Sequence, residues 1–334
     1  MTHAPTPLAD HHNRLINYLR ISITDRCNFR CQYCMPTKGI PLLNHADILT
    51  YEDILRCARI AISLGLRKIR VTGGEPLVRR GVVSLLAELS RLPDLADLSL
   101  TTNGALLGHY AAALRAAGLH RVNVSLDTLR PERFATITRQ PVLTNVLEGI
   151  RAAEAAGLHP VKLNVVTMRS VNLDEIADFA AMALHHAYEV RFIELMPVGG
   201  HAYWDSAQLV PGEEVLQILS KRYELAPLDD PAGAPVSGRL FQIRGAAGRI
   251  GLISPMTDHF CRHCNRLRLT PDGKLRTCLF HEAEVDLRRL LRGGVDDEAL
   301  AGVFRSAVAQ KPAGPAGGIG GGWKCTSAMS RIGG

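Results

Sequence analysis

The chain of 334 residues has few aromatic side chains and no long apolar run. Phe, Tyr and Trp make up 5% of it and do not alternate with its arginines, so a stacking platform for nucleic-acid bases is not expected. No stretch supplies the roughly 20 apolar residues that span a bilayer. Residues 1–17 contain no apolar segment of the kind found in secretory signals. We therefore expect no membrane and no nucleic acid as partner, and a cytoplasmic location.

The remaining composition is that of a globular protein with an excess of positive charge. Hydrophobic residues make up 46% and charged residues 21%, and the formal net charge is +7. The length suits one large domain or two ordinary ones. The charge favours an anionic partner, but nucleic acid, a nucleotide or solubility alone would each satisfy it. In a reducing compartment the eight cysteines indicate metal binding more often than disulfides.

Three cysteines fall in one short segment, Cys27, Cys31 and Cys34, with the spacing C-x3-C-x2-C. Thiolates select zinc, copper(I) or iron–sulfur clusters. An all-cysteine 4Fe-4S cluster takes four thiolates, and no fourth cysteine lies nearby, so one iron would keep an open position for a substrate or cofactor. The alternative is a partial zinc knuckle completed by a distant histidine.

Apolar strand-like segments alternate with helical ones up to about residue 227. A helix is predicted to begin at Thr50, because Asp53 completes a capping-box pattern. Three helices should end at Gly65, Gly118 and Gly157, since glycine suits the left-handed position after a helix. This repeat implies parallel strands with right-handed crossovers, and six units make an α/β fold, a partial TIM-like (βα)6 barrel. The predicted strands are 19–24, 68–72, 98–102, 121–126, 161–166 and 190–195.

Alternate residues of these strands are polar or cationic, whereas a typical barrel interior is filled by Val, Ile and Leu. A solvated sheet face would explain the polarity, but it fits poorly with a helix after every strand. Burying several unpartnered cations is too costly, so we expect an interior that holds water and an anion. The residues on this face are Arg20, Ser22, Thr24, Lys68, Arg70, Thr72, Thr101, Asn103, Asn123, Ser125, Lys162, Asn164 and Arg191.

The loop after the second strand reads Gly73-Gly74-Glu75-Pro76. Paired glycines let backbone approach a ligand closely, and a carboxylate can accept from an ammonium group. Alone, this motif would be a turn before a helix. One βα unit after the three-cysteine segment, it suggests a cofactor site.

Beyond residue 227 the pattern changes from alternating helices to hairpins. Hairpins are predicted at 239–254 and 265–280, and helices at 284–291 and 297–310. The expected organisation is a flexible arm at 1–17, a barrel at 18–227, a linker at 228–238, a smaller α+β domain at 239–311 and a Gly-rich tail at 312–334.

A second cysteine cluster, Cys261, Cys264 and Cys278, has the spacing C-x2-C-x13-C. Zinc with His263 or His281 as the fourth ligand is a serious alternative. Strand alternation, however, places Arg266 and Arg268 on the face of Cys264, and a structural zinc needs no cations beside it. We therefore predict a second open-iron cluster that faces an anionic substrate.

Several segments together resemble the GTP 3′,8-cyclase family, the molybdenum cofactor biosynthesis protein A (MoaA) family of the radical S-adenosylmethionine (SAM) superfamily. The resemblance extends from about residue 13 to residue 334. It is carried by residues 24–31 (TDRCNFRC), 68–77 (KIRVTGGEPL), 101–104 (TTNG), 192–197 (FIELMP), 260–268 (FCRHCNRLR) and the final Gly333-Gly334.

The resemblance implies a radical lyase with two 4Fe-4S clusters and SAM as cofactors. SAM on the first cluster would yield a 5′-deoxyadenosyl radical that converts GTP into (8S)-3′,8-cyclo-7,8-dihydroguanosine 5′-triphosphate, the first step of molybdopterin synthesis. An electron donor would feed the cluster, and cyclic pyranopterin monophosphate synthase would take the product. The oligomeric state stays open, with a homodimer as one option.

The resemblance also implies site residues. The metal ligands would be Cys27, Cys31, Cys34, Cys261, Cys264 and Cys278, and the guanine of GTP would bind the second cluster. SAM would contact Tyr33, Gly74, Glu75, Ser125 and Met196. GTP would contact Arg20, Lys68, Arg70, Thr101, Lys162, Arg191, Arg266, Leu267 and Arg268. Leu267, whose side chain points away by strand alternation, would act through its backbone.

The tail is the least expected part of this site. A Gly-rich end is disordered by default, yet Trp323, Met329 and Ile332 are apolar anchors. Gly333 and Gly334 could enter a crowded site without a side-chain clash, as the resemblance also implies, and we expect the tail to thread back into the barrel. Cys57 is expected in the core and Cys325 as a spare tail thiol.

Two other functions stay open. One is a radical SAM enzyme that modifies peptides with an auxiliary cluster, although a peptide would not require a cation-lined interior. The other is a basic zinc module that binds nucleic acid, which the scarcity of aromatic residues disfavours.

Overall fold

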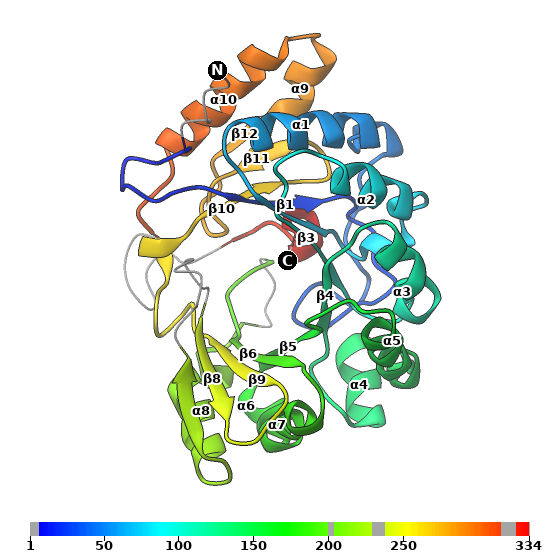
Figure 1. Ribbon diagram of the computed structural model, residues 1–334, viewed down its shortest axis with the longest axis vertical. Coiled ribbons are helices and arrows are strands. Elements are labelled where there is room, and N and C mark those ends of the chain that lie inside the picture. Colours follow the sequence, from blue (N-terminus) through cyan, green and yellow to red (C-terminus); the bar gives the residue numbers. More distant parts are fainter. Residues whose placement is uncertain (1–6, 200–203, 229–237, 315–324, 334) are drawn as a thin grey trace.

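The computed structural model describes residues 7–199, 204–228, 238–314 and 325–333 (Figure 1). Six parallel strands form the centre of its sheet, and all six predicted strands are present with ends shifted by at most two residues. The apolar residues that alternate with the polar interior face, such as Ile21, Val71 and Val124, are fully buried in the hydrophobic core. The strands are β1 (Tyr18–Ser22), β2 (Lys68–Thr72), β3 (Asp97–Thr102), β4 (Arg121–Ser125), β5 (Lys162–Thr167) and β6 (Glu189–Glu194).

Helices follow these strands on the outside of the ring that Figure 1 shows. The first helix begins as predicted, because the hydroxyl of Thr50 accepts from the backbone N–H of Asp53 and the Asp53 carboxylate accepts from the N–H of Thr50. The barrel helices are α1 (Tyr51–Ser63), α2 (Val82–Ser90), α3 (Leu107–Ala116), α4 (Pro131–Thr138), α5 (Leu143–Ala155), α6 (Arg169–Asn172), α7 (Ile176–His185) and α8 (Gly212–Ser220).

The C-terminal strands extend the same sheet at both of its edges. In the described residues the strand order is β12-β11-β10-β1-β2-β3-β4-β5-β6-β9-β8-β7. Next to β6 lie β9 (Arg249–Ile253), β8 (Arg239–Ile243) and the unpredicted β7 (Leu225–Leu228). Next to β1 lie β10 (Arg266–Leu269), β11 (Lys274–Arg276) and β12 (Glu284–Asp286). The last helices are α9 (Leu287–Arg292), α10 (Asp297–Ala309) and α11 (Met329–Ile332). Parallel pairing of β10 with β1 and of β9 with β6 joins the two expected domains through one sheet.

Two sequence-based expectations are wrong in this region. Residues 284–286 were predicted to begin a helix, but they pair with β11, and Asp286 caps the helix that follows. Residues 7–17 were predicted to belong to a flexible arm. Instead, Arg14 is buried and ion-paired with Asp10, and its guanidinium donates to carbonyls of the C-terminal region. The rest of the predicted arm, residues 1–6, lies outside the described residues.

Across the described segments, none of the helices combines the length and apolarity that crossing a membrane requires.

Two helix-ending glycines provide a test of backbone strain. Gly118 after α3 and Gly157 after α5 both have a positive φ, +85° and +77°. A Cβ on Gly157 would meet only the Arg115 Nε at 3.8 Å, whereas one on Gly118 would lie 2.6 Å from the Cβ and Oγ of Ser90. We expect Gly157→Ala to lower the unfolding free energy by about 1–2 kcal/mol and Gly118→Ala to lower it further. Urea unfolding of both variants measures these losses of unfolding free energy. Equal losses in the two variants would show that the Ser90 side chain moves aside without an energetic cost.

Candidate functional site

A cavity of about 350 Å³ opens inside the ring of strands. It is lined from both parts of the chain, by the loops after β1 and β2, by strand-end residues and by the segments around β10 and β11. All six cysteines predicted as metal ligands line it: Cys27, Cys31, Cys34, Cys261, Cys264 and Cys278. Most of the predicted contact residues also line it: Arg20, Tyr33, Arg70, Gly74, Thr101, Ser125, Arg191, Met196, Arg266 and Arg268.

A row of three arginines crosses the cavity wall. In the strand register Arg268 lies opposite Arg20, and Arg20 lies opposite Arg70. Burial, together with neighbouring arginines, lowers the pKa of Arg70 and of Arg268 to about 10. Among the described residues, Arg70 and Arg268 form no ion pair with a carboxylate. A buried cation row of this kind is stabilised by an anion in the cavity.

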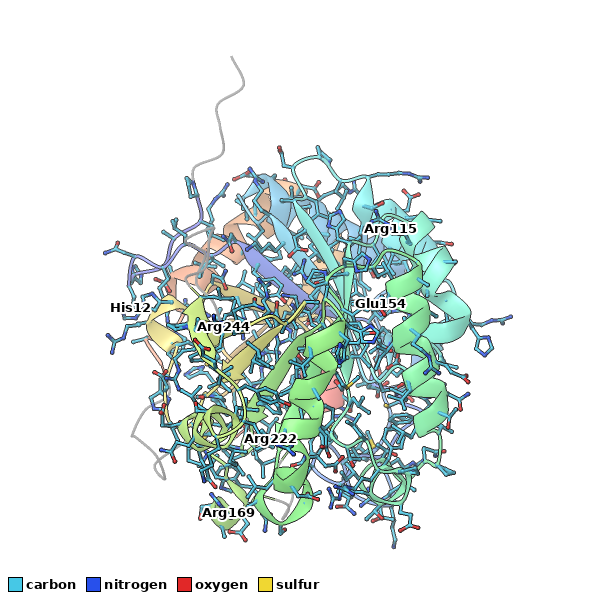
Figure 2. All side chains as sticks on the ribbon, turned by 60° about the horizontal axis from the view of Figure 1, so that its bottom comes forward. His12, Arg115, Glu154, Arg169, Arg222 and Arg244 are labelled. Carbon is cyan, nitrogen blue, oxygen red and sulfur yellow. The ribbon has the colours of Figure 1, made fainter. Side chains whose placement is uncertain are left out.

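These inner arginines differ from the many on the outside. Figure 2 shows Arg169, Arg222 and Arg244 on the outer surface, and all three side chains are exposed. Arg169 pairs with Glu214 and Arg244 with Glu224. Tyr18 on β1 gives the inner set a different partner, because the guanidinium carbons of Arg70 and Arg266 lie 5.4 and 6.0 Å from its ring centroid. Arg70 and Arg266 therefore lie against a neutral aromatic ring, whereas the outer arginines Arg169 and Arg244 pair with carboxylates.

The first cysteine triad occupies the loop after β1. Its thiols are free, and burial raises the pKa of Cys27 to about 11. Burial also raises the pKa of Cys31 and of Cys34 well above the usual range, and there the neighbouring thiols add to the effect. Three such thiols become thiolates together only around a positively charged centre, so the donor set fits an iron–sulfur cluster. In the described part of the chain no three Cys, His, Asp or Glu side chains are placed to share one metal ion.

The second triad lies on the turn before β10 and just after β11. The Cys264 N–H donates to the Cys261 carbonyl at 3.1 Å. Burial alone would raise the pKa of the Cys264 thiol, but the charges of Lys311 and Arg266 outweigh it and lower the pKa. The two triads therefore differ in their surroundings, and only the second lies among cations that stabilise a thiolate.

The Gly73-Gly74 loop packs against the first cysteine loop. The Gly74 N–H donates to the Thr24 carbonyl at 2.6 Å, and a Cβ on Gly74 would lie 2.3 Å from the Arg26 carbonyl oxygen. Both glycines also line the cavity. Gly73 and Gly74 are therefore needed for the close packing of the two loops. Only the part of each glycine that lines the cavity remains available to a ligand.

Glu75 is not among the residues that line the cavity, although its neighbour Gly74 is, so its expected contact with SAM stays a prediction. Its carboxylate is buried and accepts from the Leu77 N–H, the Thr102 hydroxyl and the Asn103 N–H. These donors belong to its own loop and to the end of β3. Glu75 therefore joins two loops of the site rather than presenting a free carboxylate to a ligand.

Three predicted substrate contacts are also absent from the cavity wall. Lys162 is buried and paired with Glu189 at 2.9 Å. Lys68 stands at the start of β2, away from the strand ends that line the cavity. The Leu267 side chain packs in the hydrophobic core, as strand alternation predicts. The contacts of Lys162 and of the Leu267 backbone with GTP, and the charge that Lys68 would lend, therefore stay predictions.

Sequence reasoning missed the buried carboxylates that compensate part of the interior charge. Glu189 is fully buried and pairs with Lys162, Arg191 and Arg249. Burial alone would raise its pKa, but these cations hold it well below the usual range. The period of two would have found it, since Glu189 precedes Arg191 by two residues. Its presence corrects the assumption that all interior cations lack partners.

A second missed carboxylate, Asp127, lies on the cavity wall beside the first triad. It accepts from the Tyr33 hydroxyl at 2.7 Å and from the Val166 N–H at 2.8 Å. Burial raises its pKa to about 6. Asp127 therefore fixes the orientation of Tyr33, one of the residues expected to contact SAM.

The end of the chain enters the barrel, and the red α11 lies inside the ring in Figure 1. The Gly333 carbonyl accepts from Arg268 at 2.6 Å. Gly333 has a φ of +71°, and a Cβ there would lie 2.8 Å from Thr72 Cγ2. Gly334 and the predicted anchor Trp323 lie outside the described residues.

Cys325 is not a spare thiol, because it is 1% exposed and packs with Val198 and Ile332, so it helps to anchor the tail. Cys57 is buried in the core, as predicted.

Comparison with known proteins covers nearly the whole chain. Residues 21–183 match the model of the Radical SAM superfamily and residues 188–316 match that of Molybdenum Cofactor Synthesis C. The GTP 3′,8-cyclase of Moorella thermoacetica is 51% identical over 98% of this chain and 100% of its own length, and that of Geobacter sulfurreducens is 50% identical over 91% and 93%. Streptococcus suis SuiB bound to S-adenosylmethionine shares the fold, with a TM-score of 0.61 and 16% identity over 88% of this chain and 69% of that one.

The buried carboxylate of Glu75 predicts a pH dependence of stability. Burial raises its pKa from 4.5 to about 7, so between these values the folded chain holds a proton that the unfolded chain has lost. The unfolding free energy should therefore fall as the pH rises through this window, by up to about 3 kcal/mol. Glu75→Gln should lack this slope in urea unfolding of the metal-free chain. The exposed control Glu132→Gln should retain it, and parallel curves for Glu75→Gln and wild type would contradict the prediction.

Proposed function

The chain belongs to the GTP 3′,8-cyclase family of the radical SAM superfamily, and from this premise we propose how its cavity serves that reaction. The enzyme cyclises GTP in the first step of molybdenum cofactor synthesis, with SAM and an iron–sulfur cluster as cofactors. One observation carries the assignment of the site: both cysteine triads and the arginine row line the same cavity. The peptide-modifying and zinc-module alternatives would not require this combination.

The first triad would hold the cluster that binds SAM, and the second triad would hold a second cluster beside GTP. When bound, the first cluster and SAM supply the reductive cleavage that gives a 5′-deoxyadenosyl radical. Asp127 holds the Tyr33 hydroxyl at the cavity wall, and Ser125 and Met196 complete the SAM side. The role of Glu75 is to fix the Gly73-Gly74 loop to β3.

GTP would bind on the opposite side, with its triphosphate against the arginine row. Arg20, Arg70 and Arg268 present charge from three neighbouring strands, and Arg266 and Arg191 add to it. Charge-assisted hydrogen bonds from guanidinium to phosphate are among the strong ones. Lys162, which pairs with Glu189, and the backbone of Leu267 would also contact GTP, and Lys68 would add charge.

The tail would position Arg268. The Gly333 carbonyl takes one of its N–H groups, which restricts the guanidinium to one orientation and leaves its other donors for the substrate. A glycine is required because Thr72 fills the place of a Cβ. Gly334, which the resemblance also implies, lies outside the described residues.

We also propose the remaining partners of the reaction. A one-electron donor would reduce the first cluster, and cyclic pyranopterin monophosphate synthase would receive the product. A homodimer and the cytoplasm stay predictions, the latter from the free cysteines.

The function is tested by an anaerobic assay with GTP, SAM and dithionite that follows 5′-deoxyadenosine and the cyclised nucleotide. Replacing Cys27, Cys31 and Cys34 by Ala should abolish both products, because no site for electron entry to SAM remains. Replacing Cys261, Cys264 and Cys278 by Ala should instead remove productive GTP binding. Intact GTP affinity and cyclisation without the second triad would refute its role beside the substrate.

Arg268 and Leu267 give a matched pair for the substrate side. Arg268→Ala removes a cation of the row and should weaken GTP binding by a factor of about 100 or more, since a charge-assisted pair in a closed site contributes a few kcal/mol. Leu267→Ala should leave GTP affinity close to wild type and lower the unfolding free energy by about 2–5 kcal/mol. Equilibrium dialysis with GTP and urea unfolding separate the two effects. Unchanged GTP affinity in Arg268→Ala would count against the proposed binding mode.

A further inference from the structure

Two buried cations from opposite ends of the chain hold the backbone around the second cysteine triad. The first is Arg14, which is 6% exposed and ion-paired with Asp10. Its guanidinium donates to the carbonyl of Cys261 at 2.8 Å, across 247 positions of sequence. It also donates to the carbonyls of Pro312 at 2.7 Å and Ala313 at 3.0 Å. Arg14 thus ties the first cysteine of the triad to the segment after α10.

The second cation is Lys311, which is 3% exposed. Its ammonium donates to the carbonyl of Arg266, two residues after Cys264, at 2.9 Å, and to that of Thr277, directly before Cys278. Between them, Arg14 and Lys311 therefore hold the backbone at or beside all three cysteines. The two are also connected, since Arg14 donates to the Lys311 carbonyl at 3.4 Å.

The charge of Lys311 points to an anion at the triad. Neither Lys311 nor Arg14 lines the cavity, so neither is placed to contact substrate. Within the described ranges no carboxylate forms an ion pair with Lys311, and its electrostatic neighbours include the thiols of Cys264 and Cys278. A buried ammonium without a counter-charge is costly, and metal-bound thiolates would supply one.

We propose that Arg14 and Lys311, here named the cationic bracket, hold the second triad in the arrangement that accepts an iron–sulfur cluster, and that the Lys311 ammonium favours the reduced state of that cluster. The inference rests on the second cluster of the proposed function. Adding one electron makes the cluster and its three thiolates more negative by one charge, and a fixed ammonium beside them stabilises that charge.

The test uses the full chain with Cys27, Cys31 and Cys34 replaced by Ala, so that only the second cluster can form. Three quantities are measured anaerobically: iron and sulfide per chain, the rate of iron loss to a chelator, and the reduced fraction by paramagnetic resonance during titration with dithionite. Lys311→Gln keeps a hydrogen-bond donor without the charge. Arg14→Met removes the contact with Cys261 and leaves Lys311 in place.

We expect Lys311→Gln to load about four irons, with the ratio of reduced to oxidised cluster about tenfold lower at the midpoint potential of the parent. Arg14→Met should keep that ratio and lose iron to the chelator about tenfold faster. The exposed residues Lys221 and Arg222 give matched controls, Lys221→Gln and Arg222→Met, which should change neither quantity. A loaded Lys311→Gln cluster with an unchanged midpoint would overturn the charge effect, and unchanged iron loss in Arg14→Met would overturn the bracket.

Two further outcomes are decisive. If Lys311→Gln loads no iron, Lys311→Arg supplies the test, because it restores both charge and donors. If Lys311→Arg recovers both the iron loading and the midpoint potential of the parent, the proposal is supported. If it fails to recover the loading or the midpoint potential, the proposal is overturned. A parent chain without iron would refute the second cluster itself and the bracket with it, whereas a loaded parent with unaffected variants refutes only the bracket.

Discussion

The structure depends on a row of like charges that the fold places side by side. Parallel pairing of β10 with β1 puts Arg268 opposite Arg20, and pairing of β1 with β2 puts Arg20 opposite Arg70. Like charges in adjacent register positions repel one another, and burial removes the water that would screen them. The Tyr18 ring and the Gly333 carbonyl offset only part of this cost. In the proposed function the anionic substrate would offset more of this cost, so folding and substrate binding would depend on the same charges.

The interior carboxylates Glu189 and Asp97 pair with cations outside this row of arginines. Glu189 neutralises the cations at the start of β5 and β6, and Asp97 does the same for Arg121 at the start of β3 and β4. Glu75 is near the carboxyl ends of the strands, but donors of its own chain occupy it. Among the described residues Glu189 and Asp97 pair with cations at the start of the barrel strands, and none of these carboxylates forms an ion pair with Arg70 or Arg268.

Local periodicity predicted the parts of this arrangement that depend on local rules. The period of two identified the cavity face of β1 to β6, and the Thr50 capping box and the helix-ending glycines fixed helix boundaries. Leu267 was assigned away from the cavity for the same reason. Glu189 was missed because the predicted strand began one residue too late. Arg14 and β12 could not be found in this way. Arg14 contacts a carbonyl 247 positions away in sequence, which leaves no periodic pattern, and β12 has only three residues, too few to show one.

Segments near both ends of the described chain contact residues of the site. Residues 7–17 lead into β1, which pairs with β10, and Arg14 contacts the second triad from that segment. The tail returns to β1 and β2, where Gly333 lies against Ser22 and Thr72 and accepts from Arg268. The first segment thus holds the backbone at the second triad, and the tail holds an arginine of the row. Both act through contacts between distant parts of the sequence, which no single βα unit supplies.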